Sequence, residues 1–227
     1  MKIQYTEKGD KKVKFKISEI DFTKANAIRR AVMSYVPSMA IDRVTVYENT
    51  SILYEEMIAH RLGMVPLTTD LKTYKIPDED YKKDDATYEA TFILEKSGPT
   101  TVYSGDIKPR DPKIKPVFDN IPIVKLAENQ KIKMEMAAKL GFMNEHSKYQ
   151  GAISSYEQLN DTDFEFFVES YNNLSAKEIT ELALAALEER VSELNDEVMS
   201  AISGKKKAKA SAKTTKKSTK KPATKKK

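Results

Sequence analysis

The sequence of 227 residues contains no cysteine and no tryptophan, and its only histidines are His60 and His146. Without thiols the chain has no disulfide, no thiolate nucleophile and no cysteine ligand for zinc or an iron–sulfur cluster, which predicts a reducing location, the cytoplasm. No stretch approaches the eighteen consecutive apolar residues of a membrane-spanning helix, and Met1–Asp10 alternates like a strand rather than like a signal peptide. We therefore expect a soluble chain without membrane contact.

Catalytic motifs are missing as well. The sequence has no Gly-rich phosphate loop, no nucleophile elbow, no His-Glu-x-x-His pair and no Asp-rich loop of the kind that holds magnesium in nucleotide polymerisation. Two imidazoles are also few for metal or acid–base sites. We predict no catalytic residue, no metal ligand and no cofactor in this chain.

Charge is distributed unevenly along the chain. The net charge is +5, but twelve lysines and no acidic residue lie between Gly204 and Lys227. Residues 1–203 therefore carry 27 Lys+Arg against 34 Asp+Glu, a net charge of about −7. This difference predicts a folded body followed by a disordered, basic tail at 204–227. The tail has no aromatic residue for stacking on bases, so weak, non-specific contact with nucleic-acid phosphates and a merely solubilising role are equally supported.

Periodicity predicts an α+β fold in residues 1–203. Helical spacing predicts helices at 24–36 and 55–62, the first preceded by the N-cap candidate Asp21. The prolines between Pro109 and Pro122 predict an extended surface loop, and residues 141–162 are also expected to be loop. Alternating apolar residues predict a hairpin within residues 3–17 and strands at 41–46, 88–94, 101–107, 130–137 and 164–168.

The C-terminal helix, residues 175–202, is the clearest predicted element. Ser175 and Glu178 form a capping-box pattern, and one apolar stripe runs from Ile179 to Ile202. Such a helix is about 42 Å long, whereas a compact unit of about ninety residues is only about 30 Å across. We therefore expect part of the stripe to face a partner, the alternative being a stripe that packs on its own domain with a frayed end.

Several segments together resemble a known family. They are Ala25–Arg30, Val36–Asp42, Asn49–Ser51, Ile58–Leu67 and, in support, Gly141–Tyr149. In these residues the chain closely resembles the D-type subunits of archaeal DNA-directed RNA polymerases, a family that is related to bacterial alpha and to the third-largest subunit of eukaryotic RNA polymerase II.

The resemblance implies a discontinuous dimerisation domain with a sheet and two helices, at 1–46 and 160–203, and an inserted, mainly β domain at 47–159. It implies a non-catalytic scaffold subunit that pairs with the small subunit L and then docks subunits N and P and the large subunits. The apolar residues expected at the dimer interface are Ile28, Val32, Tyr35, Ile179, Leu182, Leu187, Val191, Leu194 and Val198.

Docking of the large subunits is implied for a second set of residues. Spacing alone favours a solvated helix face for Arg29 and Arg30, and the resemblance shifts the interpretation toward function. The predicted docking residues are Arg29, Arg30, Asn49, Thr50, Ser51, His60 and Arg61. Many family members carry an additional domain with a cysteine-ligated iron–sulfur cluster, and the absence of cysteine predicts that this chain lacks the cluster.

Two rival interpretations remain at this point. The apolar stripe is compatible with a homodimer, as in bacterial alpha, and equally with a heterodimer, and the sequence pattern does not distinguish the two. A free-standing DNA-compacting protein driven by the lysine tail is the other.

Overall fold

The structure is a computed structural model that describes residues 2–78, 81 and 85–202. One compact unit extends to Glu189, and a second begins at Arg190. The predicted tail at 204–227 lies outside the described residues. No helix within the described residues is long and apolar enough to cross a membrane.

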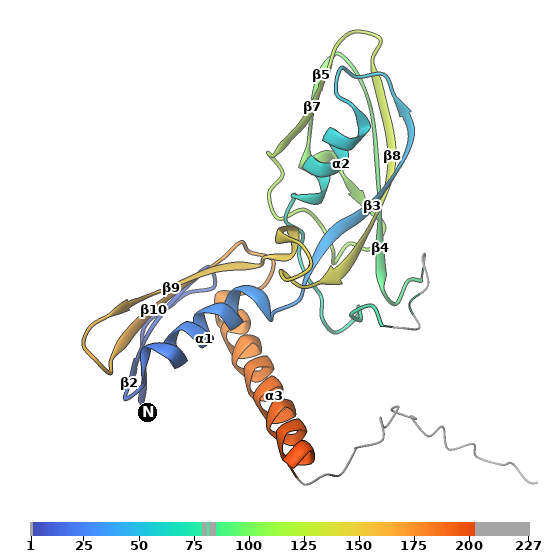
Figure 1. The fold of residues 1–227 in the computed structure, drawn as a ribbon. Coiled ribbons are helices and arrows are strands. Elements are labelled where there is room, and N and C mark those ends of the chain that lie inside the picture. Colours follow the sequence, from blue (N-terminus) through green and yellow to red (C-terminus); the bar gives the residue numbers. More distant parts are fainter. Residues whose placement is uncertain (1, 79–80, 82–84, 203–227) are drawn as a thin grey trace, which may run out of the picture. The chain divides into compact units, whose positions relative to one another are not determined.

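A four-stranded antiparallel sheet forms the first part of the fold, with strand order β1-β2-β10-β9 (Figure 1). The predicted hairpin is present as β1, Lys2–Lys8, and β2, Lys12–Ser18. The predicted strand at 164–168 is β10, Phe164–Ser170, and it pairs with β2. Alternation along these strands sends one face inward, and Phe15 stacks on Phe166 with ring centroids 5.1 Å apart.

Helix α1, Phe22–Ser34, covers this sheet by packing against β9 and β10. The predicted N-cap is confirmed, because the Asp21 carboxylate accepts a hydrogen bond from the Lys24 backbone N–H at 2.8 Å. The buried stripe of α1 consists of Ala25, Ile28, Ala31 and Val32. Together with the inward faces of β2 and β10 and the first turns of the C-terminal helix, this stripe forms one hydrophobic core.

A second core lies between residues 39 and 140. Its main sheet has the order β3-β8-β4-β6, and β5 and β7 form a separate pair. Helix α2, Glu55–Gly63, packs on β3 and β7 through Ile58 and Leu62. The strand bounds are Ser38–Asn49 for β3, Glu89–Ser97 for β4, Thr100–Tyr103 for β5, Lys108–Pro109 for β6, Pro122–Leu126 for β7 and Lys131–Gly141 for β8.

The prediction of a loop throughout 141–162 is wrong. A 3-10 turn, η2, occupies Ser147–Tyr149, and β9, Ala152–Gln158, completes the first sheet beside β10. The inward positions of β9 are Ala152, Ser154 and Tyr156. Because none of them is a large aliphatic residue, the alternation carries little hydrophobic signal. Consequently β9, which falls inside the predicted inserted domain at 47–159, belongs by pairing to the first sheet.

The predicted strand at 101–107 and the proline-rich loop also differ from the structure. The strand ends at Tyr103 and is followed by the 3-10 turn η1, Ser104–Asp106. The proline-rich segment ends in β7, which Pro122 can begin because its missing N–H falls at the first strand position. Ile114 in this segment is fully buried, so the segment is only partly a surface loop.

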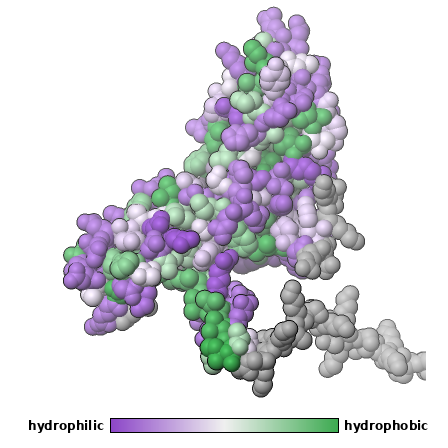
Figure 2. Space-filling view, in the orientation of Figure 1, coloured by the Kyte–Doolittle hydropathy of each residue, from purple (hydrophilic) through white to green (hydrophobic). Residues whose placement is uncertain are grey.

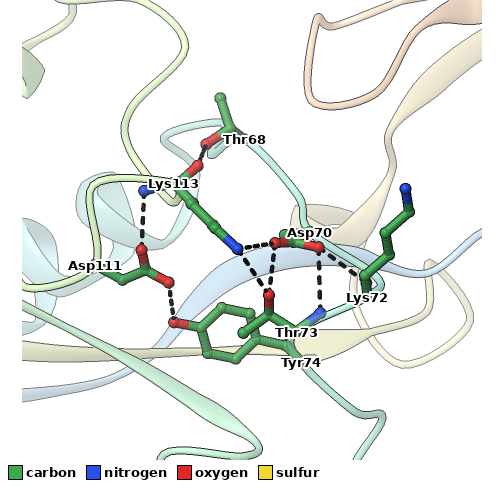
Figure 3. A network of polar contacts seen from close by, with 7 residues as sticks. All are labelled: Thr68, Asp70, Lys72, Thr73, Tyr74, Asp111 and Lys113. Atoms are coloured by element: carbon green, nitrogen blue, oxygen red, sulfur yellow. Dashed lines mark hydrogen bonds and ion pairs between the residues drawn. The ribbon is translucent and has the colours of Figure 1, made fainter.

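A network of polar contacts fastens the proline-rich segment to residues 68–74 (Figure 3). The Thr68 hydroxyl donates to the Lys113 carbonyl at 2.7 Å, and the Tyr74 hydroxyl donates to the Asp111 carboxylate at 2.9 Å. The Lys113 ammonium lies 3.4 Å from the Asp70 carboxylate. These contacts order a segment whose prolines supply few backbone donors.

Candidate interaction surfaces

The C-terminal helix α3, Ala176–Ile202, begins at the predicted cap. The Ser175 hydroxyl accepts a hydrogen bond from the Glu178 backbone N–H at 3.2 Å, and the Ala176 N–H donates to the Asp10 carbonyl at 2.7 Å. Ile179 and Ala183 belong to the first core, and Thr180 between them is also buried. The first two turns of α3 are therefore part of the folded body.

The later turns of α3 carry their apolar residues exposed to solvent. The exposed fraction is 58% for Val191, 61% for Leu194 and 77% for Ile202, and every residue from Glu188 to Met199 is exposed. Figure 2 shows hydrophobic residues gathered along one side of this part of α3. A continuous apolar face of this kind is typical of a surface that binds another protein.

The predicted dimer-interface residues fall into three groups according to how exposed their side chains are. Ile28, Val32 and Ile179 are buried in the chain's own core. Tyr35, Leu182 and Leu187 are partly buried and pack against that core. Val191, Leu194 and Val198 are exposed, so they are the members of the set that a partner can reach directly. The interface itself remains a prediction.

Arg29 and Arg30 differ in their surroundings on α1. The Arg29 guanidinium donates two hydrogen bonds to the Asn26 side-chain carbonyl, at 2.9 and 3.2 Å, and is half-buried. Arg30 is exposed. Arg29 is thus held in place by its own helix, whereas Arg30 points into solvent.

Asn49, Thr50 and Ser51 use their side chains within the turn between β3 and α2. The Asn49 amide N–H donates to the Leu53 carbonyl at 2.9 Å, and the Asn49 carbonyl oxygen accepts from the Ser51 hydroxyl at 2.7 Å. The Thr50 hydroxyl accepts from the Lys131 backbone N–H at 2.7 Å. These three residues shape the turn, and their polar groups already have partners inside the chain.

The same turn displays exposed apolar residues that are not among the named docking residues. Ile52 is 83% exposed and Tyr54 80% exposed, the highest values among large hydrophobic side chains in the described residues. Met57, in the first turn of α2, is 56% exposed. The available signal was the apolar Ile52 and Tyr54 directly before an amphipathic helix, outside its buried stripe.

His60 and Arg61 lie at the other end of α2. The Arg61 guanidinium donates to the Pro122 carbonyl. His60 is exposed and lines a hollow of about 190 Å³ together with His146, Lys148 and Asp42. The structure therefore brings together the chain's two histidines, which come from separate motif segments.

Asp42 organises the polar side of this hollow. Its carboxylate lies 2.8 Å from the Lys148 ammonium and 3.0 Å from that of Lys139. Burial by itself would raise the pKa of Asp42, but hydrogen bonds from the two lysines outweigh burial and lower it. Burial, and next the charge of Asp42, raise the pKa of the Tyr149 hydroxyl.

Metal-binding geometry is not found among the described residues: no three His, Cys, Asp or Glu side chains converge on one point. The chain also lacks the cysteines that would ligate an iron–sulfur cluster, so its residues do not fit that group. The exposed apolar residues on α3 and on the turn between β3 and α2 are instead suited to binding protein.

Comparison with known proteins identifies the family. Residues 44–163 match the RNA polymerase Rpb3/RpoA insert domain. The chain is 43% identical over 157 residues to DNA-directed RNA polymerase subunit Rpo3 of Pyrococcus furiosus, a match that covers 69% of this chain and 59% of that protein. The subunit of the same name from Thermococcus kodakarensis is 44% identical over 153 residues, which is 67% of this chain and 58% of the relative.

A third relative is matched over more of its own length. Subunit Rpo3 of Methanocaldococcus jannaschii is 40% identical over 166 residues, which is 73% of this chain and 80% of that protein. The matches to the first two relatives span less than two thirds of those proteins. The chain belongs to the Rpo3 family, the D-type subunits of archaeal DNA-directed RNA polymerases.

Proposed function

We propose that this chain is a non-catalytic assembly subunit of a DNA-directed RNA polymerase. In this proposal it pairs with the small subunit L and then docks subunits N and P and the large subunits, without a cofactor of its own. The observation that carries the proposal is the exposed apolar face of α3, with Val191 and Leu194 about three-fifths exposed. Burying each such side chain contributes roughly 1.5–3 kcal/mol, which exceeds the 0–1 kcal/mol of surface ion pairs.

Charge on α3 favours a different chain over a second copy as the partner. The exposed turns carry Glu188, Glu189, Glu193, Asp196 and Glu197 against the single base Arg190. Two copies of this helix side by side would place like charges along the seam, which is destabilising. A partner helix with basic residues beside its apolar stripe avoids this repulsion.

Pairing is tested by placing carboxylates on the exposed part of the stripe. The variant Val191→Asp with Leu194→Asp would bury unpaired charges at the interface, so we expect affinity for co-expressed subunit L to fall about a hundredfold or more. Co-purification and analytical ultracentrifugation measure the loss. Leu187 is left unchanged because it packs against the chain's own core.

The matched control adds two carboxylates to the same helix outside the stripe, as Ser192→Asp with Ser200→Asp. This control should pair normally. Unchanged pairing by the Val191/Leu194 variant, or a stable homodimer that forms in place of the complex with L, would contradict the proposal.

A further inference from the structure

The loop that follows α2 contains a residue that packs against both cores. Leu71 contacts the second core, to which the flanking Leu67 and Tyr74 belong, and it also contacts the first core. It is the only partly buried hydrophobic residue in the described part of the chain that does so. The chain itself passes between the cores twice, at 37–38 and at 141–151, so Leu71 makes a third connection that is not covalent.

Two hydrogen bonds of Thr69 extend this connection. The Thr69 hydroxyl accepts from the Met39 backbone N–H at 3.1 Å, and the Thr69 N–H donates to the Asn173 carbonyl at 3.1 Å. Met39 is the second residue of β3, and Asn173 lies three residues before α3 begins. Residues 69–71, which we call the latch, therefore connect the second core to the segment that leads into α3.

The latch is held in one conformation by contacts on the side of the second core. The Asp70 carboxylate accepts from the Lys72 backbone N–H at 2.9 Å and from the Thr73 hydroxyl at 2.7 Å (Figure 3). Thr68, directly before the latch, donates its N–H to the Lys115 carbonyl at 2.9 Å, and its hydroxyl accepts from the Lys115 N–H at 2.9 Å. A loop that is already ordered loses little further entropy in keeping its contact with the first core.

The segment that receives the latch is also closely packed. Asn173 is buried, and a Cβ on Gly151 would lie 2.5 Å from its side-chain nitrogen. The Tyr171 N–H donates to the Gly151 carbonyl at 3.0 Å. Residues 171–173 are therefore held both by the end of the connecting segment 141–151 and by the latch, and they have little room to rearrange.

We propose that the latch fixes one orientation of the second core relative to the first sheet. Domains that are joined by chain segments alone move relative to each other by default, and 37–38 and 141–151 are the segments that serve as the hinge when the latch opens. With the latch closed, the chain loses less rotational freedom when another protein contacts both cores, so such a protein binds more tightly. The inference goes beyond the proposed function, because it concerns the chain by itself.

Distances between two spin labels test the latch in the full chain. Because the sequence contains no cysteine, Lys125→Cys in β7 and Glu157→Cys in β9, both at exposed positions, provide the only thiols for nitroxide labels. Double electron–electron resonance measures the distribution of distances between the labels. We expect the latch variant, Thr69→Val with Leu71→Ala, to widen this distribution about twofold or more.

Three further variants separate the latch from general loosening of the fold. Thr69→Ser with Leu71→Met keeps the hydroxyl acceptor and most of the apolar volume, so it should restore the narrow distribution. Thr45→Val with Leu53→Ala makes similar changes at an exposed strand position and at a leucine that packs against the second core alone, so it should leave the distribution unchanged. Thr69→Val by itself keeps every apolar contact and should still widen the distribution measurably.

Circular dichroism checks that each variant is folded. A label pair within the second core, Lys125→Cys with Lys133→Cys, should give the same distribution in all of them. An unchanged distribution in both the latch variant and Thr69→Val would overturn the inference. Equal widening in the Thr45/Leu53 control, or widening that persists in the Ser/Met variant, would overturn it as well. None of these distances depends on subunit L, so a failure here is distinct from a failure of the proposed function.

Discussion

At the scale of single residues, Asp70 shows how local hydrogen bonds set a charge. Its carboxylate accepts from the Thr73 hydroxyl at 2.7 Å and from the Lys72 N–H at 2.9 Å, and Lys113 lies close by (Figure 3). The Thr73 hydroxyl, followed by the Lys72 backbone N–H, lowers the pKa of Asp70 from 3.8 to about 2. The folded state therefore favours the charged carboxylate.

This lowered pKa predicts how stability depends on pH. Because the folded pKa lies below the unfolded one, the stabilisation is fully present above pH 3.8 and is lost as the pH falls through about 2. We expect Asp70→Asn to lower the free energy of unfolding by about 1–2 kcal/mol at pH 7 and by much less at pH 2. Urea unfolding at both pH values measures this.

The matched control for this prediction is Asp161→Asn, at an exposed turn position. It should change stability little at either pH. A deficit of Asp70→Asn that is equal at pH 7 and pH 2 would show that the charge of Asp70 is not the cause.

Residue-level roles were only partly predictable from the sequence. The segment Gly141–Tyr149 was selected by resemblance, and the structure supplies a physical reason for its glycine: a Cβ on Gly141 would lie 2.6 Å from the Tyr149 ring. Asn49 and Ser51 were selected as docking residues, yet their side chains bond to each other. Both facts depend on how a turn folds back on itself, which residue spacing alone does not specify.

At the scale of secondary structure, strong hydrophobic periodicity was sufficient to predict a helix or a strand, and weak periodicity was not. The alternation of Ile132, Met134 and Met136 predicted β8, and the 3.6-residue repeat predicted α1 and α3. Strand β9 was missed because a pairing partner, rather than its own hydrophobicity, makes it a strand. Strand β7 was missed because a proline argues against a strand interior, whereas Pro122 only begins the strand.

The cap of α3 leads to a prediction for this element. Ser175→Ala removes the acceptor for the Glu178 N–H, so we expect the free energy of unfolding to fall by about 1 kcal/mol. Chemical denaturation followed by circular dichroism measures it. Ser192→Ala, at an exposed position in the middle of the same helix, is the control and should be neutral or slightly stabilising, since alanine is the better helix former within a helix. Equal losses in the two variants would argue against the cap.

At the scale of the whole molecule, two cores and one exposed helix face explain why the sequence indicated a partner. The length of α3 predicted that its own domain could not cover the whole apolar stripe, and the buried part of α3 does end near Leu187. The sequence alone did not predict that Ile52 and Tyr54 are exposed, because their exposure depends on the path of the turn. It also did not define the inserted domain, since β9 returns to the first sheet.

The separation of charge between body and tail gives a prediction for the full chain. Deleting residues 204–227 removes twelve lysines and changes the net charge from +5 to about −7. We expect pairing with subunit L to survive, because α3 ends at Ile202. We expect retention on immobilised DNA to fall strongly at low salt and to differ little from the full chain at high salt, where phosphate contacts are screened.

A tail of the same composition in scrambled order provides the control for this deletion. Because the tail has no aromatic residue to stack on bases, binding through it should depend on charge and not on order, so the scrambled tail should restore DNA retention. Gel-shift titrations over a range of salt concentrations compare the three chains. Failure of the scrambled tail to restore binding would mean that the tail reads more than phosphate charge. Loss of pairing with subunit L on deletion would show that the tail takes part in assembly. Equal retention of all three chains on DNA would show that the tail has a solubilising role alone.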